Sequence, residues 1–169
     1  MYISHGVSGS KRRGFLKAGF LCSAVIIMDG CSIFGVTTSR DTIATLQNDL
    51  FPKAKELGIN TVNYISIIAK HSRISAQDKD FLKNGVKWLN ESAVKMHKKQ
   101  YTQLSSAKRQ LVLTEIMNTS WGSAWCDNML RYIFEAMLGD RIYGGNNGEA
   151  VWKWLAFNGG LPRPTKGYL

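Results

Sequence analysis

The sequence predicts an all-α fold, a small bundle of about five amphipathic helices followed by an irregular C-terminal tail rich in glycine and tryptophan. Two observations predict this fold. Apolar residues recur at steps of three and four, and no segment shows the alternation of apolar and polar residues typical of a strand. The length of 169 residues suits one domain, and 44% hydrophobic with 20% charged residues excludes a disordered or collagen-like chain.

The first two expected helices lie on either side of Pro52. Residues 39–51 carry apolar side chains at helical spacing, and Pro52 interrupts the pattern. The short segment after this proline closes at Gly58. Residues 60–70 are apolar and β-branched, and we expect a helix there because the chain offers no strand with which they could pair.

The next three helices have clearer boundaries. Residues 75–78 read as a capping box that begins a long helix, and Ser105 or Ser106 begins another. Residues 121–138 form a strongly apolar helix that Gly139 ends. In the first of these helices one face carries Leu82, Val86, Leu89, Ala93 and Met96. The second helix carries the apolar residues Leu111, Leu113, Ile116 and Met117, and the third carries Trp125, Met129, Leu130, Ile133, Phe134 and Met137.

The net charge is +10, from 22 basic and 12 acidic residues. A basic chain suits nucleic acid, an anionic membrane surface or an acidic protein. The first 31 residues contribute four basic side chains against one acidic one, so about +7 remains on the rest. Residues 95–99 are rich in lysine, but basic residues near a helix C-terminus commonly face solvent and favour the helix dipole. No nucleic-acid partner is therefore expected.

Residues 1–38 are interpreted as an export signal and linker. A cationic stretch precedes about ten apolar residues, half of the roughly 20 that span a bilayer. The cationic stretch resembles a twin-arginine (Tat) signal, although Lys11 stands where that motif asks for Ser or Thr. The residues that carry this resemblance are Arg12, Arg13, Phe15, Leu16 and Lys17.

A cysteine follows the apolar stretch. Gly30 and Cys31 resemble a lipoprotein processing site, but Asp29 is unusual inside such a site. Lipidation of Cys31, ordinary cleavage and no cleavage all stay open. In each case the folded domain is expected to start near Ser39.

No catalytic, cofactor-binding or metal-binding residue is expected on this chain. It lacks a glycine-rich phosphate loop and the Cys-x-x-Cys-His motif that attaches haem c. His5, His71 and His97 have no metal-ligating residue four positions away on a helix face. Cys126 lies in an apolar helix and is expected to be a buried, inert thiol, with a disulfide to Cys31 as the alternative.

Residues 140–169 are expected to form a partner-docking tail in the same domain as the helical bundle of residues 39–139. Seven of the 16 glycines lie in residues 139–169, and the glycines with Asn146 permit a tight turn. Aromatic residues on such an irregular tail favour docking, and the alternative is a tail packed on its own bundle. The residues expected to dock are Tyr143, Gly144, Gly145, Asn146, Trp152, Trp154 and Tyr168.

Over most of its length the chain resembles the gluconate 2-dehydrogenase subunit 3 family, the small (gamma) subunits of membrane-bound flavin dehydrogenases. The twin-arginine start, Asp-Leu-Phe-Pro at residues 49–52 and Phe-Leu-Lys-Asn-Gly-Val-Lys-Trp-Leu-Asn at residues 81–90 support the resemblance. Its most specific element is Tyr-Gly-Gly-Asn at residues 143–146 together with Trp152.

The resemblance implies a non-catalytic subunit of an oxidoreductase complex. FAD would belong to a large GMC-type flavin dehydrogenase subunit, and haem c to a membrane cytochrome c subunit. This chain would escort the folded flavin subunit through the Tat translocase and stabilise it in the periplasm. The inner membrane would be reached through the complex or through a lipid on Cys31. Gluconate, another sugar acid and a sugar are equally compatible substrates of the partner.

Two other readings stay open. The chain could be a stand-alone exported helical lipoprotein that binds a ligand or the cell envelope. It could also be an autonomous enzyme that uses Cys126 or a histidine.

Overall fold

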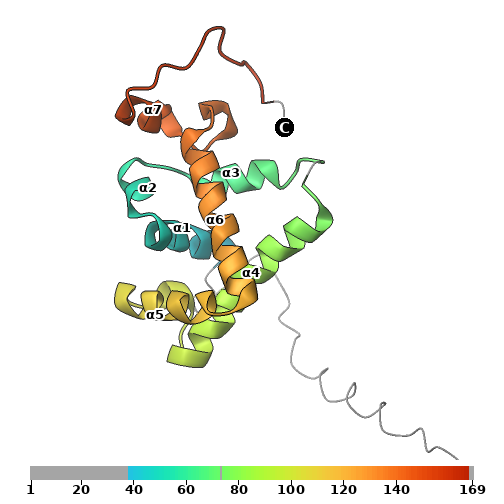
Figure 1. Ribbon diagram of the computed structural model, residues 1–169, viewed down its shortest axis with the longest axis vertical. Helices are drawn as coiled ribbons and strands as arrows, with labels where there is room; N and C mark the ends of the chain where they lie inside the picture. The colour runs from blue at the N-terminus through green and yellow to red at the C-terminus, as the bar shows by residue number, and fades with distance from the viewer. Residues whose placement is uncertain (1–37, 73, 168–169) are drawn as a thin grey trace, which may run out of the picture. The chain divides into compact units, whose positions relative to one another are not determined.

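The computed structural model describes residues 38–72 and 74–167, and this part of the chain is built from helices without strands (Figure 1). The predicted all-α fold is confirmed. The α-helices are α1 (Ser39–Leu50), α2 (Pro52–Glu56), α3 (Thr61–Ile68), α4 (Ala76–His97), α5 (Ser106–Met117), α6 (Ser120–Leu138) and α7 (Ala150–Trp154). Beside the five expected helices, α2 and α7 are short helices of five residues each.

Several predicted functional residues lie outside the described part of the chain. These residues are Arg12, Arg13, Phe15, Leu16, Lys17, Cys31 and Tyr168.

Side-chain caps explain where two of the helices begin. Thr38 Oγ1 accepts a hydrogen bond from the Asp41 amide at 3.2 Å, and the Asp41 carboxylate accepts one from the Thr38 amide at 3.1 Å. Ser75 Oγ accepts from the Asp78 amide at 3.0 Å, so the predicted start of α4 is confirmed. Ser105 occupies the N-cap position of α5, but its hydroxyl makes no capping hydrogen bond.

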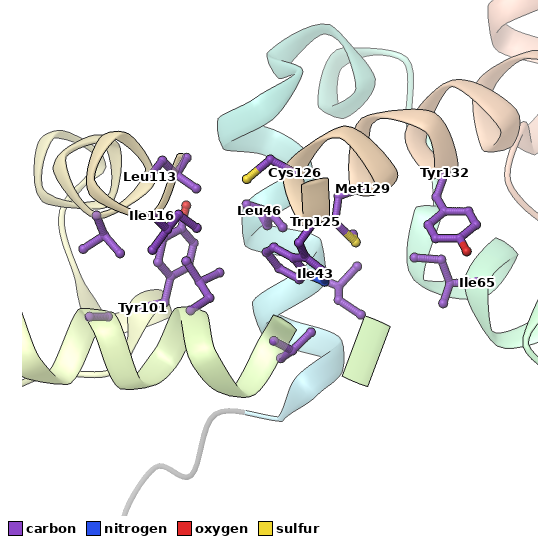
Figure 2. Close-up of a cluster of buried hydrophobic side chains, with 14 of the residues drawn as sticks. Ile43, Leu46, Ile65, Tyr101, Leu113, Ile116, Trp125, Cys126, Met129 and Tyr132 are labelled. Atoms are coloured by element: carbon purple, nitrogen blue, oxygen red, sulfur yellow. The ribbon is translucent and has the colours of Figure 1, made fainter. Parts of the chain in front are cut away.

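Helix α6 is the centre of the packing. It contacts α1, α3, α4, α5 and α7, and Figure 1 shows it running from the α4–α5 end toward α7. Its buried face follows from apolar positions at steps of three and four. Figure 2 shows Trp125 and Met129 beside Ile43 and Leu46 of α1. This packing anchors the rest of the fold to one helix.

Helices α4 and α6 approach each other closely at Gly85. A Cβ atom at this position would lie 2.0 Å from Nε1 of the fully buried Trp125. The Trp125 indole N–H donates to the Leu82 carbonyl at 3.3 Å. The glycine inside the long helix α4 is therefore required by the neighbouring helix.

Four apolar side chains of the predicted amphipathic helices are exposed: Met96, Leu111, Met117 and Phe134. In α5 the buried face consists of Val112, Leu113 and Ile116. Successive residues of an α-helix are about 100° apart, so a face centred on these three turns Leu111 toward solvent. Met96 lies in the last turn of α4, where fewer neighbours cover it.

A partly buried ion pair joins α1 to α5. Arg109 Nε lies 2.6 Å from Asp49 Oδ2, and Arg109 Nη2 lies 3.0 Å from Oδ1. The Tyr101 hydroxyl donates to Asp49 Oδ2 at 2.7 Å, and burial raises the pKa of this tyrosine. The hydrogen bonds with Asp49 raise the pKa of Arg109. Asp49 thus serves the chain's own stability.

Candidate partner-binding surface

The segment 143–146 forms a tight turn that packs against α3 and α6. Gly144 has a φ of 71°, a conformation that favours glycine, and its carbonyl accepts from Asn63 Nδ2 at 3.1 Å. The Gly145 carbonyl accepts from the Asn60 amide at 3.0 Å. A Cβ atom on Gly145 would lie 2.5 Å from a carbonyl oxygen of α6. The two glycines are therefore needed for the turn to approach the bundle.

Asn146 is fully buried and holds the start of α7. Its Oδ1 accepts from the Val151 amide at 3.1 Å, and its Nδ2 lies 3.5 Å from the Gly139 carbonyl. In this conformation a partner cannot touch the Asn146 side chain. Gly145 and Asn146 therefore take part in the chain's own fold, and their expected role in docking a partner stays a prediction.

Trp152 is the centre of the C-terminal segment. Its indole N–H donates to the Leu138 carbonyl at 2.8 Å, at the end of α6. The Phe157 ring meets the Trp152 ring edge-on with centroids 5.3 Å apart, and the Arg163 guanidinium lies 4.3 Å from the Trp152 ring centroid. A Cβ atom on Gly159 would lie 2.6 Å from the same ring. The chain after α7 therefore folds back around Trp152.

Arg163 fixes this fold-back by charge as well as by stacking. Its Nη2 forms an ion pair with Glu149 and lies 3.4 Å from Asp140 Oδ2. The Asp140 side chain is mostly buried, and its negative charge is paired with the positive charge of Arg163. The segment after α7 is thus fixed to the turn that precedes α7.

The same segment exposes large apolar side chains, and we call residues 154–161 the apolar segment. The exposed fractions are 52% for Trp154, 48% for Leu155, 56% for Phe157 and 86% for Leu161. Lys53 of α2 places its Nζ 5.7 Å from the Trp154 ring centroid. Large exposed apolar patches commonly mark sites that contact another protein or a membrane. Of the predicted docking residues, Trp154 is the one that this exposure favours.

A separate apolar groove of about 710 Å³ lies between α3, the end of α6 and the turn after it. Its lining includes Tyr64, Phe134, Leu138 and Tyr143. The Tyr64 hydroxyl donates to Glu135 Oε2 at 3.0 Å, and burial together with this carboxylate raises the pKa of Tyr64. Tyr143, a predicted docking residue, therefore belongs to the groove.

Cys126 is a free, buried cysteine, as predicted. Burial raises the pKa of its thiol to about 11, so the unreactive protonated form dominates at neutral pH. Its alternative disulfide partner, Cys31, lies outside the described residues. Across residues 38–72 and 74–167, no cluster of three or more His, Cys, Asp or Glu side chains could hold a metal ion.

No helix within residues 38–72 and 74–167 has both the length and the apolar character needed to cross a membrane.

Sequence reasoning missed Arg163, Leu155 and Leu161 as parts of this surface. Arg163 stands between two prolines, and its charge partners precede it by 14 and more residues. Neither the spacing of residues nor the composition predicts that Arg163 contacts the Trp152 ring. The run of apolar residues that begins at Trp154 could have indicated that Leu155 belongs to this surface. The sequence does not show which residues of the run face solvent.

Comparison with known proteins assigns the chain to a family. No curated protein and no solved structure matches the chain significantly. The family model described as gluconate 2-dehydrogenase subunit 3 matches residues 38–160, well over half of the chain. This match includes the ion pair of Asp49, the close helix contact at Gly85 and the turn at residues 143–146. The chain therefore belongs to the gluconate 2-dehydrogenase subunit 3 family.

Proposed function

We propose that this chain is the non-catalytic small subunit of a periplasm-facing, FAD-dependent dehydrogenase that oxidises a sugar acid or a sugar. Family membership makes it an accessory subunit of a multi-subunit complex of the gluconate 2-dehydrogenase type. In our proposal the large GMC-type subunit carries FAD and the substrate pocket. A cytochrome c subunit with haem c then receives the electrons at the inner membrane.

The observation that carries this proposal is the exposed apolar segment at the end of a well-packed body. Trp154, Phe157 and Leu161 are exposed although the helices bury two clusters of apolar side chains elsewhere. A few residues supply most of the binding free energy in protein interfaces, and tryptophan is enriched among them. A subunit that stabilises a larger partner needs such a surface.

The escort role rests on the predicted twin-arginine signal at Arg12 and Arg13. A Tat translocase carries folded proteins, and a subunit that binds FAD in the cytoplasm must cross the membrane folded. One signal on this chain would then serve both subunits, provided that the two bind before export. Membrane attachment would follow through the cytochrome subunit or through a lipid on Cys31.

Affinity purification of the full chain from its own cells tests this proposal. We expect a large polypeptide with bound flavin to be recovered in fixed stoichiometry, together with dehydrogenase activity on a sugar acid or a sugar. The purified chain alone should lack that activity. Recovery of the chain without any flavoprotein would favour the alternative, a stand-alone exported lipoprotein or binding protein. Robust activity of the chain alone would contradict the non-catalytic role.

A further inference from the structure

We propose that the apolar segment, residues 154–161, is a preorganised anchor that inserts into an apolar pocket rimmed by carboxylates on the flavin-carrying subunit. This inference rests on the proposed function and names the chemistry of the partner's surface. Three features of the segment carry it: its exposed apolar side chains, the contacts that fix its shape, and the sign of the charges around it.

The apolar side chains form the binding element. Leu161 is 86% exposed, and Trp154 and Phe157 are each more than half exposed. The Trp152 N–H donates to the Leu138 carbonyl at the end of α6, and the Trp152 ring packs edge-on against Phe157, so Trp152 links the segment to the bundle. A pocket that covers Leu161 and the two rings would remove a large apolar area from water.

The contacts of Arg163 fix the segment before any partner arrives. The guanidinium lies over the Trp152 ring and forms ion pairs with Glu149 and Asp140. Gly159 passes so close to Arg163 and Trp152 that no side chain fits there. A segment that is ordered in advance loses less conformational entropy on binding. Arg163 is therefore a positioning residue for the anchor.

The charges around the anchor select an acidic partner. Residues 140–169 carry four basic side chains against two acidic ones, Asp140 and Glu149, and Arg163 forms an ion pair with both acids. Arg141 and Lys153 are exposed and form no ion pair within the described residues. The surroundings of the anchor are thus positive, and carboxylates at the rim of a pocket would complement them.

A protein pocket fits these observations better than a lipid surface. A bilayer adapts to a flexible apolar loop and gains little from a rigid one. The stacking, the ion pairs and the glycine contact instead fix a definite shape, which matches a shaped cavity. Binding of the apolar segment to anionic lipid is therefore tested below as the alternative outcome.

The test compares two leucine substitutions in the full chain, measured against the flavin subunit isolated from the wild-type complex. Leu161→Asp places a charge in the proposed pocket, and Leu111→Asp makes the same change at a leucine of α5 that is 56% exposed. Losing the burial of one leucine should weaken binding roughly 10- to 100-fold for Leu161→Asp. Leu111→Asp should stay within about twofold of wild type. Equal losses in both variants would overturn the anchor.

A second pair of variants tests the positioning role. Arg163→Ala should weaken binding of the flavin subunit and speed proteolysis after Trp154, while the unfolding midpoint of the bundle stays unchanged. Arg163→Lys should restore part of the affinity, because lysine keeps the charge but loses the planar stacking. Unchanged affinity in Arg163→Ala, despite faster proteolysis, would show that the fixed shape does not matter.

Two controls separate the possible failures. If the wild-type chain binds the flavin subunit and Leu161→Asp binds it equally well, the anchor is wrong while the proposed function stands. If the wild-type chain binds no flavin subunit, the proposed function itself fails. Binding should weaken as salt rises, because opposite charges are screened. Leu161-dependent binding to phosphatidylglycerol vesicles, with no effect on the flavin subunit, would assign the segment to the membrane instead.

Discussion

Replacing Asp49 by alanine should remove about 3 kcal/mol from the free energy of unfolding, because it leaves the largely covered Arg109 guanidinium without its partner. The Asp49 and Arg109 side chains are 4% and 18% exposed. They share two close contacts, and the Tyr101 hydroxyl donates to the same carboxylate. Breaking a buried pair costs about 3–5 kcal/mol, and the lower end applies here since Arg109 keeps a hydrogen bond to the Leu104 carbonyl.

Chemical denaturation followed by circular dichroism measures this loss. For a domain of this size 3 kcal/mol corresponds to a fall of roughly 10 °C in the melting temperature. The matched control is Glu91→Ala, which removes an exposed ion pair with Lys87 and should change stability by about 0.5 kcal/mol or less. Asp49→Leu combined with Arg109→Met should be more stable than Asp49→Ala, because no unpaired charge is left in the interior.

The reasoning would be refuted if Asp49→Ala unfolded within about 0.5 kcal/mol of wild type. It would also fail if the double variant were less stable than Asp49→Ala. Either result would mean that the carboxylate contributes little and that α1 and α5 are joined by apolar packing alone.

Three further predictions follow from the packing. Gly85→Ala should lower the free energy of unfolding, measured by denaturant titration, by roughly 1–3 kcal/mol, because the added methyl group overlaps Trp125. The control Asn84→Ala, at an exposed position of α4, should not destabilise the helix. Equal stability of both variants would contradict the close contact at Gly85. Asn146→Ala should lower the free energy of unfolding by about 1–3 kcal/mol and expose the C-terminal segment to protease, because the buried Val151 amide loses its hydrogen-bond acceptor. An unchanged cleavage pattern would contradict this prediction. Cys126, whose pKa is raised to about 11, should resist alkylation at pH 8 until the protein unfolds, as peptide mapping can show. The pKa of the Cys126 thiol is higher in the folded state than the value of about 8.5 in the unfolded state, so this thiol contributes fully to the free energy of unfolding below pH 8.5. The contribution declines as the pH rises toward 11. A constant free energy of unfolding over this pH interval would contradict the raised pKa.

The helices could be predicted because their signals are local. Apolar spacing and the Ser75 cap locate α4, and the same spacing locates α6. The buried face of α5 was harder to predict, because apolar residues occur on more than one side of this helix and only its neighbours decide which side is covered. Burial of Cys126 was predicted correctly from its apolar surroundings in sequence.

The docking surface could be predicted only as a region. The turn at Gly144 and Gly145 depends on Asn63 and Asn60, more than 80 residues earlier in the chain. Such long-range contacts leave no trace in composition or spacing, so residues that build the turn were grouped with residues that face solvent. The exposure of Leu161 depends likewise on where Arg163 finds its partners.

The central claim is that this chain carries a flavin-containing partner across the membrane by its own signal. The most direct measurement is cell fractionation after replacing Arg12 and Arg13 by lysine, with this chain and the flavin subunit each quantified in both compartments. We predict that both proteins stay in the cytoplasm and that the cytoplasmic flavin subunit still contains FAD. A flavin subunit that reaches the periplasm in normal amounts in this variant would contradict the claim.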